Sequence, residues 1–347
     1  MSRSILANVR ALAHRITGVE RYTSELTRRL KGKIVTVGPG LRLSGVLGHA
    51  WEQVELPRRV GSKDILWSPA NTGPLSVSNQ VLTIHDLSPL EHPEWFRPYF
   101  AAWYGFLLPR LAHRVRLLLT ISEFTKDRIV ERLKIPEEKV VVIRPGVDTE
   151  KFHPLAGAGQ DGQPRSASLP ERYILFVGSL EPRKNLERLV LAWKSLPLST
   201  GASLGGLELV MAGGLGKSFR SIGTDHWPKG IRKLGYVGDA NLPGLYAGAM
   251  AFILPSLYEG FGLPVLEAMA CGVPVLISRN TALAEASADA AIQFDPLNVN
   301  DIASALCKVI EDDVLRQTMR LKGLERVREF SWDRVAGDVL EVIHGCA

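Results

Sequence analysis

The segment Pro255–Leu276, PSLYEGFGLPVLEAMACGVPVL, limits the possible folds more than any other part of the chain. A buried-type strand, AFILP, leads into it, and a second, VPVLI, ends it. Between them lies a glycine turn. Pro264 then suits a first helical position, because its φ is fixed and it lacks an N–H. Gly272, followed by Pro274, suits the end of that helix. The pattern predicts strand, turn, a helix over Val265–Ala270 and strand, a parallel α/β unit.

Two glutamates belong to this unit, Glu259 in the turn and Glu267 in the helix. The turn aims backbone N–H groups and the positive end of the helix dipole above the sheet, where they favour phosphate. If one carboxylate holds sugar hydroxyls and the other a ribose, the unit is a site for a nucleotide sugar. The alternative is an ordinary α/β crossover with two solvated glutamates, because two glutamates at a given spacing are common.

Length and composition indicate a globular protein of two domains. The chain has 347 residues, of which 46% are hydrophobic and 22% charged. No apolar run approaches the roughly 18 residues of a membrane-spanning helix. Asn8 and Arg10 interrupt the apolar N-terminal segment, which does not read as a secretory signal. Three cysteines without metal-ligand spacing, Cys271, Cys307 and Cys346, predict a reducing compartment, and hence a cytoplasmic protein.

The net charge of +6 favours an anionic partner. A diphosphate donor or a phospholipid surface fits this charge. Nucleic acid is not expected, because the chain has no zinc-finger spacing, ribonucleoprotein motif or arginine-rich tail. No Asp-x-Asp pattern occurs either, so no metal-bound nucleotide is expected.

Short apolar runs alternate with helical patterns in both halves of the chain, which is typical of parallel α/β domains. The expected strands lie near residues 5–8, 34–37, 64–68, 80–84, 117–121, 140–143, 173–177, 207–211, 231–236, 251–254, 273–277 and 291–294. The expected helices lie near residues 19–30, 93–110, 123–133, 185–194, 241–247, 265–270, 298–311, 314–327 and 331–343. Residues 154–171 are rich in Pro, Gly, Ser and Ala and predict a linker. The predicted division is therefore a first domain over 1–153, this linker, a second domain over 172–330 and a last helix over 331–347.

A basic pair, Arg183-Lys184, follows the strand YILFVG, which ends at Gly178. Ligands of open parallel sheets bind outside the carboxyl ends of the strands. Cations also oppose the dipole at the start of a helix, so a basic pair in that place usually serves an anion. We expect both residues to bind and stabilise a leaving diphosphate.

Two further positions follow strands of the first half. Gly18 opens the first expected helix, where a lone glycine is usually only a tight turn. His85 and Asp86 end the strand VLTIHDL, where a lone histidine is more often structural than catalytic.

Several of these segments together resemble retaining glycosyltransferase family 4. EGFGLPVLEAMACGVPV resembles the family's signature, SLEPRKN its GxLxxRKN motif, and TGVERYTSEL its first loop. HDL matches a cleft-facing strand end. RPGVD resembles the family's interdomain element, but Arg144 stands where Asn is common, which argues against a direct donor contact from this position. Gly146 and Asp148 are instead expected to shape the hinge. Ser122 either lines the cleft or caps the N-terminus of a helix. The resemblance implies the GT-B fold, two Rossmann-like domains facing across a cleft, with the last helix crossing back to the first domain.

The resemblance also implies roles for individual residues. It makes Arg183 and Lys184 the stabilisers of the leaving diphosphate, Glu259 the group that holds the sugar hydroxyls, and His85 a contact of the reacting centre. It places Gly18 near the donor phosphates and Glu267 on the ribose. The expected donor-binding set is Gly18, Gly178, Arg183, Lys184, Glu259, Gly260, Phe261, Gly262, Leu263 and Glu267. Glu285 matches a further family glutamate, and no metal or cofactor is implied.

TGVERYTSEL with HDLSPLEHPEWF looks most like the bacterial mannosyltransferases that build O-antigen or exopolysaccharide. The expectation is transfer of mannose from GDP-mannose to a saccharide or lipid-linked saccharide, with retention of configuration by front-face displacement. Rhamnosyl, glucosyl or galactosyl transfer is the near alternative. A nucleotide-sugar epimerase of the same fold and a catalytically silent binder are further alternatives.

The segment Phe96–Arg116, FRPYFAAWYGFLLPRLAHRVR, mixes aromatic and aliphatic residues with arginines. One interpretation places it on the anionic inner face of the cytoplasmic membrane, where a lipid-linked acceptor would be held. The other, which the pattern favours, packs it as an amphipathic helix on the sheet of the first domain.

Overall fold

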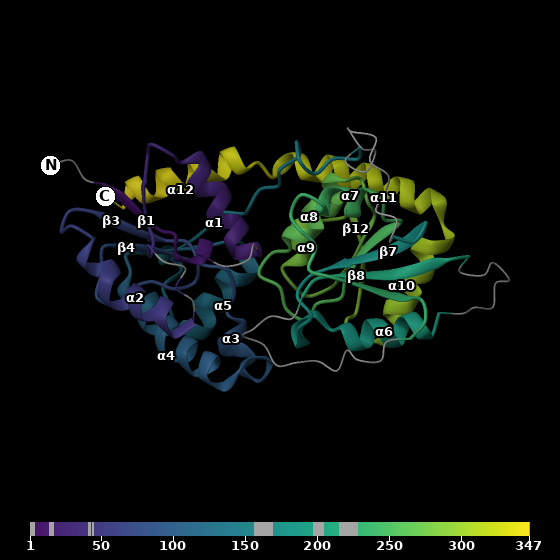
Figure 1. Cartoon of the computed structure of the whole chain (residues 1–347), viewed down its shortest axis with the longest axis horizontal. Coiled ribbons are helices and arrows are strands. Elements are labelled where there is room, and N and C mark those ends of the chain that lie inside the picture. The colour runs from purple at the N-terminus through teal and green to yellow at the C-terminus, as the bar shows by residue number, and fades with distance from the viewer. Residues whose placement is uncertain are drawn as a thin grey trace. The chain divides into compact units, whose positions relative to one another are not determined.

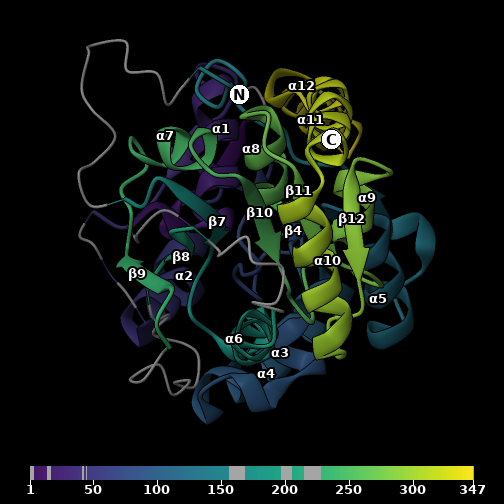
Figure 2. The same cartoon turned by 90° about the vertical axis from the view of Figure 1, so that its right-hand side faces the viewer.

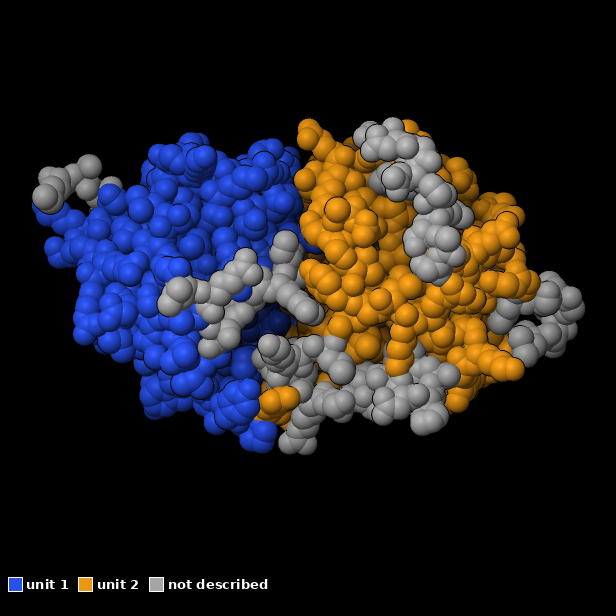
Figure 3. All heavy atoms as spheres, in the orientation of Figure 1, with its two compact units in different colours: residues 1–93, 98–146, 331–347 blue, residues 94–97, 147–330 orange. Residues whose placement is uncertain are grey.

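The structure is a computed structural model that describes residues 4–13, 17–40, 43, 45–155, 169–196, 205–214 and 228–346. It divides into two compact units (Figure 3). Unit 1 comprises Met1–Pro93, Pro98–Gly146 and Ser331–Ala347, and unit 2 comprises Glu94–Arg97 and Val147–Phe330. The sequence placed the first boundary at residue 153, whereas the structure places it at Gly146. Val147 belongs with unit 2 because its N–H donates to the carbonyl of Phe330 at 3.1 Å. Most of the predicted linker, residues 156–168, lies outside the described residues.

Unit 1 is built on a parallel six-stranded sheet in the order β2-β1-β3-β4-β5-β6. Leu6 of β1 pairs with Val35 of β2 on one side and Leu66 of β3 on the other, which sets the register of these three strands. Most of these strands are short apolar runs buried on both faces, as parallel strands covered by helices must be. Their bounds are β1 Ile5–Asn8, β2 Val35–Val37, β3 Ile65–Ser68, β4 Gln80–Ile84, β5 Leu117–Thr120 and β6 Val140–Val142.

Helices cover both faces of this sheet (Figure 1). The helices α1 (Gly18–Arg29) and α12 (Trp332–Gly345) lie together on one side, and α2, α4 and α5 lie on the other. The pairing of the first two rests on an edge contact between Tyr22 and Trp332, whose ring centroids are 6.0 Å apart. The remaining helical elements of unit 1 are η1 Arg10–Ala13, α2 Gly45–Arg58, α3 Ser88–Glu91, η2 Pro93–Trp95 (which runs into unit 2), α4 Pro98–Arg114, α5 Glu123–Leu133 and η3 Glu137–Lys139.

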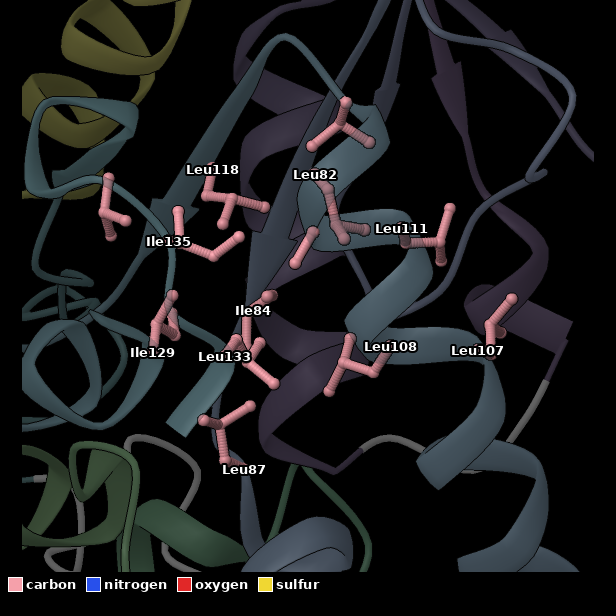
Figure 4. Close-up of a cluster of buried hydrophobic side chains, with 13 residues drawn as sticks. Leu82, Ile84, Leu87, Leu107, Leu108, Leu111, Leu118, Ile129, Leu133 and Ile135 are labelled. Carbon is pink, nitrogen blue, oxygen red and sulfur yellow. The ribbon is translucent and has the colours of Figure 1, made fainter. Parts of the chain in front are cut away.

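The core of unit 1 explains the position of α4. Leu107, Leu108 and Leu111 of this helix are buried among side chains of β4, β5 and α5 (Figure 4). The interpretation of Phe96–Arg116 as a helix packed on the sheet is therefore confirmed. Tyr99 and Phe106 of the same helix remain exposed, at 62% and 46%.

Unit 2 has a second parallel six-stranded sheet, in the order β12-β11-β10-β7-β8-β9. Helices α6 and α10 cover one face, and α7, α8 and α11 cover the other (Figures 1 and 2). Its strands are β7 Arg172–Val177, β8 Leu207–Ala212, β9 Ile231–Gly235, β10 Ala251–Leu254, β11 Val275–Ser278 and β12 Ala291–Phe294. Its helical elements are η4 Pro182–Lys184, α6 Leu186–Lys194, α7 Leu242–Ala247, α8 Leu263–Ala270, α9 Leu283–Ser287, α10 Val299–Glu311, α11 Asp313–Arg326 and η5 Val327–Glu329.

The predicted α/β alternation is confirmed, with each expected strand present within a few residues of its predicted bounds. The largest omission is α2, which the sequence analysis did not predict. Its sequence GVLGHAWEQVELPR contains two glycines and Pro57, and its apolar residues follow no clear helical stripe. Tertiary burial of Trp51 and Leu56 against β1 and β3 compensates for this weak local pattern.

Candidate functional site

The first candidate region lies in unit 2, where the loops after β7 and β10 meet. These strands are neighbours and run parallel, so both loops leave the same edge of the sheet. The N–H of Leu257 in the second loop donates to the carbonyl of Arg183 in the first, at 2.8 Å. The structure thereby brings together two motifs separated by more than seventy residues in the chain.

Glu259 is the centre of a charged network in this region. Its Oε2 accepts from Arg183 Nη1 at 2.9 Å, and its Oε1 accepts from Lys184 Nζ at 2.5 Å. Ser256 Oγ donates to the same Oε1 at 2.6 Å. Burial raises the pKa of Glu259, but Lys184 and Arg183 outweigh it and bring the pKa to about 2. Glu259 is therefore ionised at neutral pH although it is only 7% exposed.

A second carboxylate, Glu181, also contacts Arg183 of the basic pair. It is fully buried and forms an ion pair with Arg183 Nε. Burial raises the pKa of Glu181, Arg183 and Lys184 lower it, and Glu259 raises it again. No motif in the sequence singles out Glu181. Its place in EPRKN beside the basic pair was visible, but its burial was not.

A close backbone contact explains the glycine at position 213 at this edge. Gly178 follows β7, and its N–H donates to Ala212 of β8 at 2.9 Å. Gly213 has φ +149°, and a Cβ on it would lie 1.8 Å from the carbonyl oxygen of Gly178. No side chain fits there, so position 213 requires glycine where the segments after β7 and β8 meet.

The glycine turn ends in the N-terminus of α8. Gly262 is the N-cap with φ +110°, and a Cβ there would meet Leu283 Cδ2 at 2.5 Å. The helix begins at Leu263, so the predicted start at Val265 was two residues late and Pro264 is its second residue. Phe261 is buried against Phe330, with ring centroids 5.7 Å apart. The turn is thus anchored by an apolar side chain, and Gly260 beside it supplies no bulk.

Glu267 does not share the partners of Glu259. It is the fifth residue of α8, is 5% exposed, and accepts a hydrogen bond from Tyr246 Oη at 2.9 Å. Tyr246, on α7, was not identified from the sequence. Glu285, on α9, contributes its backbone carbonyl as an acceptor for Arg326 Nη2 at 2.7 Å.

The second candidate region lies in unit 1, at the carboxyl end of β4. His85 is 5% exposed, and its Nε2 lies 2.7 Å from the carbonyl oxygen of Pro69. Because a carbonyl only accepts, this contact assigns the proton to Nε2 and leaves Nδ1 as an acceptor in the neutral ring. Burial lowers the pKa of His85, and the contact with Pro69 and the charge of Asp86 oppose this only in part.

Neighbouring groups hold His85 in place. Asn71 Oδ1 accepts from its backbone N–H at 2.6 Å, and Tyr22 of α1 packs edge-on, with ring centroids 4.8 Å apart. Asp86 instead accepts from Ser88 N and Oγ, at 2.9 and 2.6 Å, at the start of α3. Asn71 and Tyr22 were not predicted, because they lie far from His85 in the sequence and no local pattern shows the contact.

Gly18, Ser122 and Arg144 complete the positions expected in unit 1. Gly18 is the exposed first residue of α1, after the N-cap Thr17, and residues 14–16 before it lie outside the described residues. Ser122 accepts from Thr125 N at 3.0 Å, so its interpretation as an N-cap is confirmed. Arg144 lies 3.7 Å from Glu123 and is partly exposed.

No group of three or more His, Cys, Asp or Glu in the described part of the chain is arranged to hold a metal ion. Within the same residues, no helix is both long and apolar enough to cross a membrane.

Comparison with known proteins defines the class. The family model described as "Glycosyl transferases group 1" matches residues 162–326, and "Glycosyltransferase Family 4" matches residues 66–151. Among solved structures, Anabaena Alr3699/HepE in complex with UDP-glucose aligns with a TM-score of 0.76 at 16% identity, covering 99% of this chain and 100% of that one. The fold is GT-B, and the chain is a glycosyltransferase.

Curated relatives narrow this class. "O-antigen chain mannosyltransferase B" of Escherichia coli is 33% identical over 278 residues, 75% of this chain and 68% of the relative. "Serotype-specific mannosyltransferase WbdA" of E. coli is 30% identical over 270 residues, which cover 74% of this chain and 32% of that protein. The chain belongs to glycosyltransferase family 4 and is a hexosyltransferase. It spans about a third of the length of WbdA.

Proposed function

We propose that the protein transfers mannose from GDP-mannose to a hydroxyl of a saccharide or lipid-linked saccharide in cell-surface polysaccharide synthesis, with retention of configuration. The observation that carries the proposal is the Arg183–Lys184–Glu259 network at the carboxyl edge of a parallel sheet. The names of two relatives, both mannosyltransferases of E. coli and one of them acting on an O-antigen chain, support the choice of sugar and pathway.

Charge explains how the network would serve a diphosphate donor. Breakage of the bond between sugar and phosphate leaves negative charge on the departing diphosphate, and fixed cations stabilise that charge. Arg183 offers a delocalised positive charge that its two carboxylate contacts hold in one orientation, and Lys184 offers a compact charge. Backbone N–H groups of the Phe261–Leu263 turn would add donors at the positive end of α8. No metal or other cofactor is then needed.

Carboxylates would position the two ends of the donor. Glu259 is kept ionised, so it can accept hydrogen bonds from sugar hydroxyls as well as orient the two cations. Glu267, held by Tyr246 Oη, would accept from the ribose hydroxyls. Gly18 and Gly178 would let the backbone approach the donor.

We assign His85 to the reacting centre. Its neutral ring has Nδ1 as an acceptor, which suits a hydrogen bond from a sugar or acceptor hydroxyl. In a front-face displacement, the departing phosphate oxygen would take the proton of the acceptor hydroxyl as the new glycosidic bond forms. His85 would then orient a hydroxyl without removing its proton.

A panel of nucleotide sugars tests this function. GDP-mannose, UDP-glucose, UDP-galactose and dTDP-rhamnose are each incubated with the protein, and released nucleoside diphosphate and sugar are measured. Faster release of GDP than of the other nucleotides supports the mannosyl donor. If another donor is turned over faster, its sugar replaces mannose in the proposal. Glucose is then the first candidate, because the HepE complex contains UDP-glucose. An epimeric product without release would contradict transfer.

We also propose peripheral contact of unit 1 with an anionic membrane on the cytoplasmic side. Tyr99 and Phe106 on α4, and Val46 and Leu47 on α2, expose large apolar side chains. The Arg110 guanidinium lies 4.0 Å from the centre of the Phe106 ring, so apolar and cationic groups are adjacent.

Sedimentation with anionic liposomes tests this contact. Neutralising Arg110 and Arg114 should weaken binding, while Arg116 is left in place because it donates to the carbonyl of Cys346. Unchanged binding of the double variant would contradict the membrane role.

A further inference from the structure

Glu181 has no role in the proposed function, yet it is the most deeply buried carboxylate of the unit 2 region. Its exposed fraction is 0%, against 7% for Glu259 and 5% for Glu267. Its Oε2 makes no hydrogen bond to any residue that the structure describes. A buried carboxylate with so few donors is costly, and such a group calls for a specific reason.

The partner of Glu181 supplies that reason. Glu181 pairs with Nε of Arg183, while Nη1 of the same guanidinium donates to Glu259 Oε2 at 2.9 Å and to the carbonyl of Tyr258 at 3.2 Å. Arg183 is thus held from two sides, by one carboxylate in each loop. Because the guanidinium is planar, contacts at Nε and Nη1 fix its orientation.

The two carboxylates differ in how firmly they keep their charge. The charged groups that act on Glu181 are Arg183, Lys184 and Glu259. Burial raises the pKa of Glu181, whereas the pKa of Glu259 falls to about 2 because the same cations outweigh its burial. When further negative charge arrives, Glu181 is the acid that accepts a proton first.

We propose that Glu181 is a positioning residue that orients Arg183 for the donor diphosphate and, by offsetting one cation, keeps diphosphate binding weak enough for product release. The proposal rests on the proposed function. With Glu181 and Glu259 ionised, the two cations and two carboxylates sum to zero charge. A bound diphosphate adds negative charge, and Glu181 then takes a proton from solvent to form the neutral acid.

The test measures binding of GDP and of inorganic pyrophosphate by calorimetry from pH 5 to pH 8, in the native protein and in Glu181→Gln. At pH 8 the variant should bind both ligands about tenfold more tightly, because one buried negative charge is gone. For each ligand, the dissociation constant of the native protein divided by that of Glu181→Gln should approach one toward pH 5, because Glu181 of the native protein becomes neutral as well. Protonation of the ligand cancels in this ratio.

Turnover separates orientation from charge. Glu181→Gln should lower kcat for donor hydrolysis about five- to tenfold while tightening GDP binding, since Arg183 loses its anchor. Glu181→Asp keeps the charge but shortens the reach, so it should lower kcat with GDP binding unchanged within about twofold. Glu187→Gln, on the exposed side of the adjacent α6, is the matched control and should change neither quantity.

The outcomes are distinguishable. If the native protein binds neither GDP nor pyrophosphate, the proposed function fails. If it binds them but the ratio between native protein and Glu181→Gln is the same at every pH, Glu181 is only structural and the inference is overturned. If Glu181→Gln does not fold, Glu181→Asp decides, because unchanged turnover in that variant also overturns the inference.

Discussion

Each unit carries a buried arginine–glutamate cluster at the carboxyl edge of its sheet, and the two clusters differ in composition. In unit 1, Arg10 Nε lies 3.2 Å from Glu52 Oε1, and Asn8 Nδ2 donates to the same oxygen at 2.7 Å. Thr72 links both partners, at 2.8 Å from Arg10 Nη2 and 3.1 Å from Glu52 Oε1. In unit 2, two adjacent cations face Glu181 and Glu259, with Ser256 as the added side-chain donor.

The difference separates a structural cluster from a ligand site. Asn8 and Thr72 add neutral hydrogen bonds to a single Arg10–Glu52 pair, and the cluster joins β1, α2 and the segment after β3. Oε2 of Glu52, like Oε2 of Glu181, makes no hydrogen bond to any residue that the structure describes. The unit 2 cluster holds four charges on two loops, two of them adjacent cations, where unit 1 has one arginine and one glutamate. Buried ions are costly unless well paired, so the unit 2 cluster is better explained by a charged ligand than by stability.

The largest expected effect is on activity, at Glu259. Glu259→Gln should lower kcat for donor turnover about 10²- to 10³-fold, because it removes the charge that orients both cations and an acceptor for the sugar hydroxyls. Steady-state kinetics with the preferred donor measure this, and circular dichroism checks the fold.

The matched control is Glu208→Gln, which removes the carboxylate of another arginine pair in unit 2, that between Arg232 and Glu208 at the amino end of β8. Its kcat should stay within about twofold of the native value. Equal kcat values for Glu259→Gln and the native protein would contradict the assignment of the site.

The second effect is on stability, at Glu52. Glu52→Gln leaves the Arg10 guanidinium buried without its counter-charge, which should lower the free energy of unfolding of unit 1 by about 3 kcal/mol. Nucleotide binding at unit 2 should be retained. Calorimetric unfolding and GDP binding measure the two quantities.

Glu55→Gln, on the same helix, provides the comparison. Its ion pair with Arg58 is exposed, so the loss should stay below about 1 kcal/mol. If Glu52→Gln and Glu55→Gln lower the free energy of unfolding by the same amount, the buried Arg10–Glu52 pair stabilises unit 1 no more than an exposed pair does.

The smallest effect concerns pH and His85. Burial lowers the pKa of His85 from 6.5, so the unfolded chain binds a proton that the folded state does not. The full contribution of His85 to the free energy of unfolding is therefore present above pH 6.5 and declines as the pH falls below 6.5. The loss is at most about 1.4 kcal/mol for each unit by which folding lowers the pKa of His85. Between pH 7.5 and 5.5, the melting temperature of His85→Gln should fall less steeply than that of the native protein. Identical pH slopes in the two proteins would refute the depressed pKa.

Much of the fold was predictable from local sequence. The strand–turn–helix–strand unit around Glu259 was visible because Pro264 fixes its own φ and Gly262 and Gly272 allow the positive φ of the helix ends. In contrast, α2 depends on burial of Trp51 and Leu56 on a sheet whose strands are far away in the chain. Its glycines and Pro57 give a weak local pattern, and packing rather than propensity makes it helical.

The sequence by itself determined the class of this protein, the two α/β units and the identities of Arg183, Lys184, Glu259 and Glu267. These depend on residue types at short spacing, which one chain displays directly. Only the tertiary structure decided which charges meet. It paired Glu259 with both cations, buried Glu181 against Arg183, gave Glu267 to Tyr246, and protonated His85 on Nε2. Such partners come from different strands of a sheet, and their charge states depend on burial, which no local spacing encodes.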